Sequence, residues 1–140
     1  MGKRFAILIG VAAAGVMALG AGAVAVPALA GQTVKIDSKV TLAVGCADLR
    51  GGQCYASLFH GRVESSKHAC EVQREVRVFS EHRRGDGLVG KDKTNRHGKW
   101  KVVAPPHPGF YYAKVLRREE GTAGTTFVCR GDRSETFDFH

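Results

Sequence analysis

The sequence predicts an all-β fold in which seven or eight short strands pack as a β-sandwich. Several short segments after residue 30 alternate apolar and polar residues, which is the period of a half-buried strand. Gly, Pro, Asn and Asp separate these segments at regular intervals, as turns do. Residues 31–140 contain no sustained helical periodicity. One small β domain follows from these observations.

The first half of this region predicts three strands. Residues 34–44 place apolar side chains at even positions, and Asp37-Ser38-Lys39 can divide this segment in two. A loop between Cys46 and Cys54 follows. Residues 59–64 place Phe59, Gly61 and Val63 on one face, and residues 72–79 present valines as an inward face.

The second half predicts four or five more strands. Asp86-Gly87 signals a hairpin after a charged loop. Residues 105–109 contain three prolines and predict a surface loop, because proline cannot donate to a strand ladder. The strands expected here begin at Leu88-Val89, contain Trp100 and Val102, and cover residues 111–115, 126–129 and 135–139.

The first thirty residues predict a secretory signal peptide. Lys3 and Arg4 precede a run without charge over residues 5–26, and Pro27-Ala28-Leu29-Ala30 resembles a signal-peptidase site. We therefore expect Sec-type export with cleavage after Ala30, which leaves residues 31–140 as a secreted, extracellular domain. A retained membrane anchor is the alternative, although no later segment is long and apolar enough to span a bilayer.

Four cysteines lie in the exported part, and an even number in a small exported domain predicts two disulfides. Three pairings are open. We favour Cys46–Cys54, which flanks a glycine-bearing loop, and Cys70–Cys129, which closes most of the domain. The cysteine and histidine spacing does not match a zinc site, so neither a metal nor another cofactor is expected.

The chain carries a formal charge of +8, and the loss of Lys3 and Arg4 leaves +6 on the mature protein. Export and the lack of an aromatic-rich RNA-binding motif argue against a nucleic-acid partner. Candidate partners are an anionic cell-wall polymer, a glycan or another secreted protein. The residues expected to form a binding surface are Arg83, Arg84, Arg96, Lys99, Lys101, Arg117 and Arg118.

Several motifs occur in an order that resembles the carboxypeptidase-regulatory-like, or transthyretin-like, β-sandwich family. The motifs are Phe59-x-Gly61-x-Val63, Cys70, Arg74-x-Val76-x-Val78, Thr94-x-x-x-Gly98-x-Trp100, Gly109-x-Tyr111-x-Ala113-x-Val115 and Cys129. This resemblance implies a Greek-key sandwich of the transthyretin-like or immunoglobulin-like kind over residues 59–140. Residues 31–58, an N-terminal strand and the Cys46–Cys54 loop, lie outside it.

The family's broad fold also hosts enzymes, but the residues for their chemistry do not match. The chain lacks the His-x-x-Glu of zinc carboxypeptidases and the His-x-His of intradiol dioxygenases, and Cys129-Arg130-Gly131-Asp132 departs from the Tyr-Arg-Gly-Ser of hydroxyisourate hydrolases. No catalytic residue is therefore assigned. Two Arg-Gly-Asp triplets, at residues 84–86 and 130–132, could mediate adhesion, but Gly and Asp are also ordinary turn residues.

The sequence thus predicts a secreted, non-catalytic binding or structural module at the cell envelope or outside the cell. Two alternatives stay open. One is an extracellular hydrolase or metal-dependent enzyme whose site the sequence hides, and the other is a secreted inhibitor or effector.

Overall fold

The computed structural model describes residues 31–122 and 124–140. The predicted signal peptide and its cleavage after Ala30 lie outside these residues. Residues 31–140 form one compact unit. Its described residues are built of strands and one 3-10 turn, η2 (His68–Cys70). The strands are β1 (Gln32–Ile36), β2 (Ser38–Val40), β3 (Ala43–Arg50), β4 (Gln53–Ser65), β5 (Glu75–Ser80), β6 (Gly87–Lys93), β7 (Lys99–Ala104), β8 (Gly109–Val115), β9 (Arg118–Thr122), β10 (Thr125–Cys129), β11 (Asp132–Arg133) and β12 (Phe137–Phe139).

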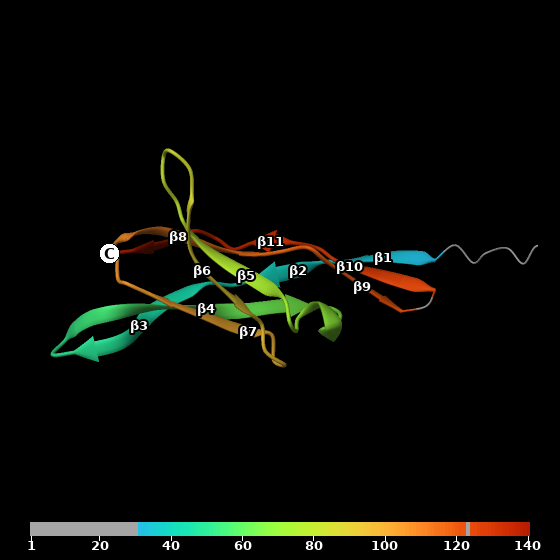
Figure 1. Ribbon diagram of the computed structural model, residues 1–140, viewed down its shortest axis with the longest axis horizontal. Coiled ribbons are helices and arrows are strands. Elements are labelled where there is room, and N and C mark those ends of the chain that lie inside the picture. The colour runs from blue at the N-terminus through green and yellow to red at the C-terminus, as the bar shows by residue number, and fades with distance from the viewer. Residues whose placement is uncertain (1–30, 123) are drawn as a thin grey trace, which may run out of the picture. The chain divides into compact units, whose positions relative to one another are not determined.

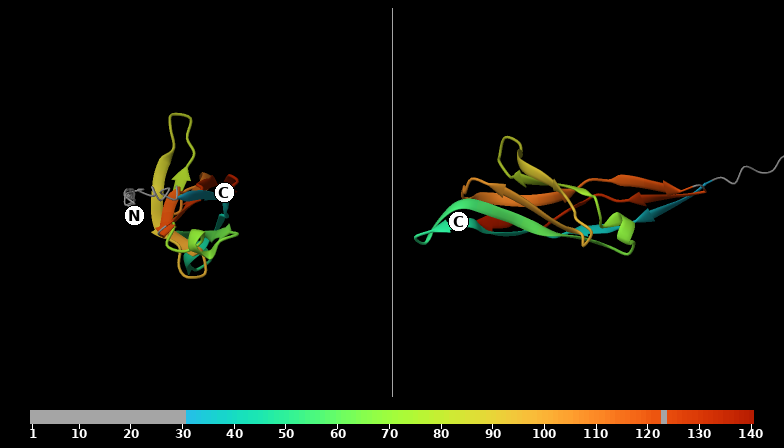
Figure 2. Two further views of the ribbon diagram at one scale, coloured as in Figure 1. Left: turned by 90° about the vertical axis from the view of Figure 1, so that its right-hand side faces the viewer. Right: turned by 60° about the horizontal axis from the view of Figure 1, so that its bottom comes forward.

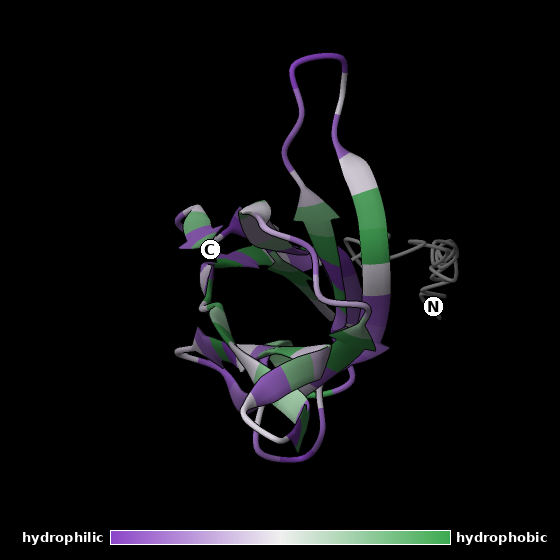
Figure 3. Ribbon diagram, turned by 90° about the vertical axis from the view of Figure 1, so that its left-hand side faces the viewer, coloured by the Kyte–Doolittle hydropathy of each residue, from purple (hydrophilic) through white to green (hydrophobic). Residues whose placement is uncertain are grey.

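The strands form a sandwich of two sheets and a smaller sheet at one end (Figures 1 and 2). In sheet I, β4 pairs with β2 and β3 on one side and with β7 on the other. In sheet II the order is β6–β5–β8–β11, and β12 also pairs with β8. The end sheet has the order β1–β10–β9, in which β1 runs parallel to β10. Figure 3 looks along the sandwich and shows the two layers.

The core lies between sheets I and II and is built from the apolar positions that alternate along the strands. Sheet I contributes Phe59 and Trp100, and sheet II contributes Val78 and Tyr111. The rings of Phe59 and Tyr111 lie 4.8 Å apart in a tilted arrangement across the sandwich. The predicted all-β class and the inward faces of these strands are therefore confirmed.

Both disulfides have the favoured pairing. Cys46 and Cys54 are joined with a Cα–Cα distance of 5.8 Å, and Cys70 and Cys129 with 5.3 Å. Paired cysteines indicate an oxidising, extracellular environment. In the described part of the chain, no helix is long and apolar enough to cross a membrane.

The expected loop between Cys46 and Cys54 is instead a β-hairpin. β3 and β4 continue through both cysteines and reverse at Gly51-Gly52. Both glycines have positive φ angles, 56° and 83°, which match the turn type that suits a two-residue hairpin. The alternating segment of residues 34–44 is also interrupted twice, and its residues belong to three strands, β1, β2 and β3.

The expected strand over residues 72–79 begins later, at Glu75. Gln73 has a positive φ of 54°, so the chain turns sharply before entering β5. Arg74 is one of the basic residues of this segment, but its side chain is fully buried. The sequence gives no sign of this burial, because arginine is rarely buried without a charged partner.

The guanidinium of Arg74 joins four separate segments. Nη1 donates to Ser38 Oγ at 3.0 Å and to the carbonyl of Cys70 at 2.7 Å. Nη2 donates to the carbonyls of Leu116 at 2.6 Å and Arg130 at 2.9 Å. Burial lowers the pKa of Arg74 to about 10, with a smaller effect from nearby Arg118, so the group stays charged at neutral pH. Three backbone carbonyls and a hydroxyl stabilise this charge by hydrogen bonds, and Glu120 adds a smaller favourable effect on the pKa of Arg74.

The Thr94-x-x-x-Gly98 motif closes the turn between β6 and β7. The buried Thr94 hydroxyl donates to the carbonyl of Glu71 at 2.6 Å and accepts from the Arg74 amide at 2.8 Å. Gly98 has a φ of 72°, and a Cβ there would lie 2.6 Å from the carbonyl oxygen of Val63. This close approach requires glycine.

The end sheet contains β9, a strand that the sequence does not predict. β9 includes Arg118, Glu119 and Glu120, and this charged composition does not suggest a strand. β1 pairs with β10 over five residues, a contact between the two ends of residues 31–140. Neither pairing leaves a local signal in the sequence.

We predict that Arg74→Met destabilises the fold by about 3 kcal/mol or more, because several buried acceptors lose their donors. Urea unfolding measures the effect. Arg117→Met is the control, since Arg117 is exposed, and its unfolding midpoint should stay close to that of the wild type. An equal midpoint for Arg74→Met would contradict the role assigned to this guanidinium.

We also predict unequal contributions from the two disulfides. Cys70 and Cys129 are 59 residues apart, and Cys46 and Cys54 are 8 apart. On the loop-entropy model, removing the first bond by paired serine substitutions costs about 4 kcal/mol, and removing the second costs about 2.5 kcal/mol. Thermal unfolding of the two double variants checks the order, and the reverse order would exclude loop closure as the main effect.

Candidate functional site: a cationic surface on both sheets

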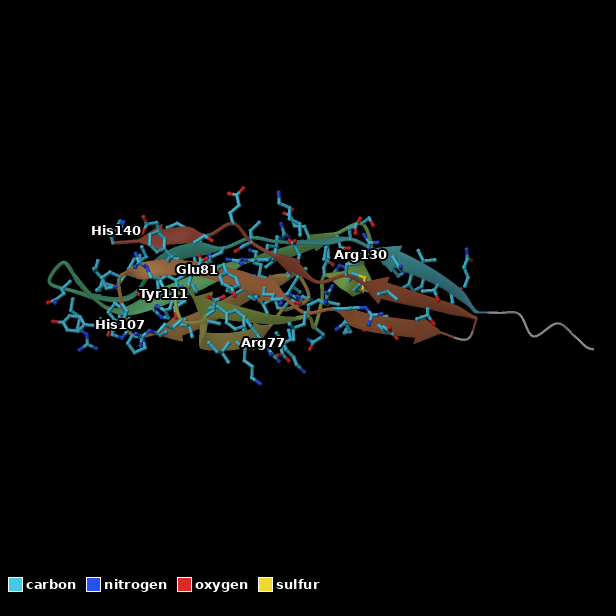
Figure 4. The ribbon with its side chains drawn as sticks, turned by 90° about the horizontal axis from the view of Figure 1, so that it is seen from above. Arg77, Glu81, His107, Tyr111, Arg130 and His140 are labelled. Carbon is cyan, nitrogen blue, oxygen red and sulfur yellow. A yellow bond between two sulfur atoms is a disulfide. The ribbon has the colours of Figure 1, made fainter. Side chains whose placement is uncertain are left out.

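The outer face of sheet II carries four basic residues side by side. Strand register places Lys91 opposite Arg77, Arg77 opposite Lys114, and Lys114 opposite Arg133. The neighbouring valines of β5 and β8 point into the core, so these four side chains point outward. We call Lys91, Arg77, Lys114 and Arg133 the cationic row. Figure 4 views the domain from this side and labels Arg77.

The outer face of sheet I carries a second group of basic residues. Arg62 lies opposite Lys99, and His60 lies opposite Lys101. All four side chains are exposed, while Phe59 and the other inward residues of β4 are buried. We call Arg62, Lys99, Lys101 and His60 the paired cluster.

Like charges directly opposite one another destabilise a sheet, by a few tenths to about 1 kcal/mol per pair. In residues 31–122 and 124–140, no carboxylate forms an ion pair with Lys91, Lys99, Lys101 or Lys114. These like-charge pairs lower the stability of the fold but create a surface that attracts anions. Residues that lower stability in this way are typical of functional sites.

Two carboxylates pair with the cationic row, since Glu81 Oε1 lies 3.6 Å from Arg133 Nη2 and Glu75 pairs with Arg77. Glu75 Oε1 accepts from Arg77 Nε at 2.7 Å. This bond, together with the positive charges of Arg77, Lys91 and Lys93, lowers the pKa of the Glu75 carboxyl below its usual value. Glu75 therefore stays ionised at neutral pH and occupies part of the donor capacity of Arg77.

An aromatic pair borders the cationic row and fixes one end of it. Phe79 stacks on Tyr112 with ring centroids 5.3 Å apart, and the Arg133 guanidinium lies 3.7 Å from the centroid of Tyr112. The Tyr112 hydroxyl donates to Asp86 Oδ2 at 2.6 Å. This bond and burial raise the pKa of Tyr112. Tyr112 faces outward, although these contacts leave only 6% of it exposed.

A groove of about 510 Å³ lies where the edges of the two sheets meet, at β6 and β7. Its lining includes Lys93, Asn95, Lys99, Trp100, Lys101 and His60. Trp100 is 3% exposed, as expected for a core residue, and its indole N–H has no hydrogen-bond partner in the described part of the chain. Trp100 therefore belongs both to the core and to the wall of the groove.

The structure separates the binding residues expected from the sequence into three groups. Lys99 and Lys101 belong to the paired cluster, and Arg96 is exposed in the turn before them. Arg83 and Arg84 lie in the exposed loop between β5 and β6, which projects from the sandwich in Figures 1 and 3.

Arg117 and Arg118 form the third group and are engaged within the domain. Arg117 pairs with Glu119. Arg118 donates to the carbonyls of Gln73 at 2.7 Å and Val72 at 3.0 Å and pairs with Glu120. These bonds assign the two arginines to the structure around the end sheet rather than to the exposed cationic surface.

The two Arg-Gly-Asp triplets also differ. Residues 84–86 are exposed in the projecting loop, where Asp86 accepts from Tyr112. In residues 130–132, Arg130 pairs with Asp37 at 2.9 Å, and Asp132 accepts from the amide of Val40 at 2.8 Å. The second triplet therefore joins β10 and β11 to the strands beside them.

A smaller cavity of about 320 Å³ opens between the sheets beside the loop that joins β7 and β8. Ser80 Oγ lies 3.0 Å from His82 Nε2, and the Tyr111 hydroxyl donates to the carbonyl of His107 at 2.6 Å (Figure 4 labels Tyr111 and His107). Ser80 also donates to the carbonyl of Gly87. In the described residues no carboxylate bonds to His82. Ser80 and His82 therefore lack the third group that orients the histidine in a catalytic triad.

Comparison with known proteins gives no match. No family model, no curated protein and no solved structure is similar to the chain. Function is therefore inferred from the geometry and charge of the surface itself.

Releasing Arg77 from Glu75 should strengthen the binding of a polyanion. We predict that Glu75→Gln steepens the salt dependence of binding by about 0.7 log unit per log unit of salt, the value for one added contact to a flexible chain. Titration with linear polyphosphate at several salt concentrations measures this slope. Glu119→Gln is a matched control, because it releases Arg117 outside the cationic row and paired cluster. A slope change of equal size in the control would show that net charge alone is responsible.

Proposed function

We propose that the chain is a secreted, non-catalytic binding protein that attaches to anionic polymers at the cell envelope or outside the cell. The observation that carries this proposal is the cationic row, in which strand register aligns four basic side chains across four strands. With strands about 4.8 Å apart, the row extends over about 14 Å. A linear polymer with repeated negative charges suits such a row better than a small anion does.

The distribution of ion pairs supports an anionic ligand. Outside the row and the cluster, several basic residues are neutralised by neighbours. These pairs are Arg50–Asp48, Arg117–Glu119, Arg118–Glu120 and Arg130–Asp37. Within the row, Arg77 pairs with Glu75 and Arg133 pairs with Glu81. In the described residues, four lysines of the two outer faces form no ion pair: Lys91, Lys114, Lys99 and Lys101. Contacts of this kind depend on charge and weaken as salt screens them.

Secretion is part of the proposal. The sequence of residues 1–30 has the features of a Sec-type signal peptide. The two disulfides are typical of proteins in an oxidising, extracellular environment. The described β structure begins at Gln32, two residues after the proposed cleavage site. Signal-peptide removal would therefore leave the domain with its first strand at the new N-terminus.

The strand connections support a Greek-key fold of the transthyretin-like or immunoglobulin-like kind. The chain passes from β4 in sheet I to β5 in sheet II, returns to sheet I at β7, and crosses again to β8. Crossings of this kind distinguish a Greek key from a simple meander. Membership of the carboxypeptidase-regulatory-like group remains a proposal that rests on the ordered motifs of residues 59–129.

Charge reversal in the middle of the cationic row tests the function. We predict that Lys114→Glu weakens binding to linear polyphosphate and to phosphate-rich cell-wall preparations, and lowers the salt slope by about 0.7 or more. The variant should fold, because the introduced carboxylate would lie between Arg77 and Arg133 and replace like-charge pairs with opposite ones.

Lys35→Glu is the matched control, since Lys35 is exposed on β1 in the end sheet. It changes the net charge by the same amount and should have a smaller effect. Unchanged binding of Lys114→Glu at low salt would refute the proposed function.

A further inference from the structure

We propose that one flexible anionic chain binds both faces of the sandwich by passing around the β6–β7 edge. This inference rests on the proposed function and adds the path and the physical class of the ligand. The chain would contact the cationic row on sheet II, cross the groove, and reach the paired cluster on sheet I.

The β6–β7 edge makes the two basic faces continuous. Asp92 Oδ2 on β6 accepts from the backbone amide of Lys101 on β7 at 2.9 Å. Nearby, a Cβ on Gly90 would lie 2.5 Å from Val102 Cγ1, so only glycine permits this approach of the two strands. The sheets therefore meet at this edge, and Figure 3 shows β6 descending along one side of the sandwich.

The groove lies on this edge and contains residues from both sheets. Lys93 belongs to β6, whereas Lys99 and Lys101 belong to β7. On sheet II, Lys93 also lies opposite Glu75 and close in sequence to Lys91 of the row. Asp92 also lines the groove, but the three lysines outnumber it, so the lining keeps a net positive charge across the edge.

The length of the path limits the ligand. The row covers about 14 Å, the two sheets are about 10 Å apart, and one more strand spacing reaches His60, which gives about 30 Å. A shorter chain could contact the residues beside the edge but could not reach both ends of the path.

The bend in the path selects a flexible ligand. Duplex DNA is stiff over about 50 nm and cannot follow a turn of this size. A lipid bilayer is flat at this scale and would meet one face at a time. A single-stranded, phosphate-linked polymer without base stacking meets both requirements, because its charges are closely spaced and its backbone bends freely. We therefore assign the ligand to flexible, linear phosphate polymers.

The test compares ligands of different length and stiffness on variants of each face. The probes are linear polyphosphate with an extended length well above about 30 Å, tripolyphosphate as a short chain, and a short DNA duplex. The sheet II variant is Arg77→Glu with Lys114→Glu, and the sheet I variant is Lys99→Glu with Lys101→Glu. Lys35→Glu with Lys39→Glu is the control, with the same change in charge. Circular dichroism and thermal unfolding verify that each variant is folded.

Calorimetry gives affinity and stoichiometry, and the fluorescence of Trp100 reports on the groove, because it is the only tryptophan in the chain. We expect long polyphosphate to bind one chain per domain and to change the Trp100 emission. Each face variant should weaken the binding of long polyphosphate by about tenfold or more, because each removes two or more charged contacts. The control pair should stay within about threefold of the wild type, and duplex DNA should depend on one face only.

Three results would contradict the inference in different ways. If the sheet I variant leaves the affinity for long polyphosphate unchanged while the sheet II variant reduces it, one face binds alone. If two long chains bind each domain, the faces act independently. In both cases wrapping is wrong and the proposed function stands. If neither variant weakens binding relative to the control, the proposed function fails as well.

Discussion

The buried guanidinium of Arg74 is the interaction on which the arrangement of the loops depends. It bonds to β2, to the end of η2, to the segment after β8 and to the segment after β10. These segments lead into the end sheet and the Cys70–Cys129 disulfide, where regular strand pairing stops. Their carbonyl groups would otherwise be buried without donors. One planar group with five N–H donors can satisfy several of them at once, which a lysine cannot do.

Because several arginines are engaged within the fold, they are less available to a ligand than the lysines are. Arg74 and Arg118 bond to backbone carbonyls, and other arginines pair with nearby carboxylates. The lysines of β6, β7 and β8 have no such role, and strand register places them beside further cations. The two outer faces thus carry four lysines that form no ion pair in the described residues: Lys91, Lys99, Lys101 and Lys114.

The sequence predicts strand faces well because the period of two is local. The inward positions of β4, β5, β7 and β8 follow from alternation alone, and the disulfide pairing follows from loop lengths. The paired cluster could be predicted in part, since Lys99 and Lys101 alternate with Trp100 and Val102. The cationic row could not, because it requires the register of four strands that are separated in sequence. The sequence indicated only that β5, β6 and β8 carry basic residues at outward positions. The burial of Arg74 could not be predicted, because the acceptors around it come from distant turns. β9 was missed because its charged residues do not suggest a strand.

The parallel pairing of β1 with β10 has a mechanical consequence. β1 lies at one end of the described domain and the C-terminus lies at the other (Figure 1). Tension applied between these two ends would act along β1 and β10 in opposite directions. Hydrogen bonds between parallel strands pulled in this way are stretched together and do not open one after another. The Cys70–Cys129 bond would also limit how far the chain could extend once the last strands had separated. The domain is thus built to resist shear between its two ends.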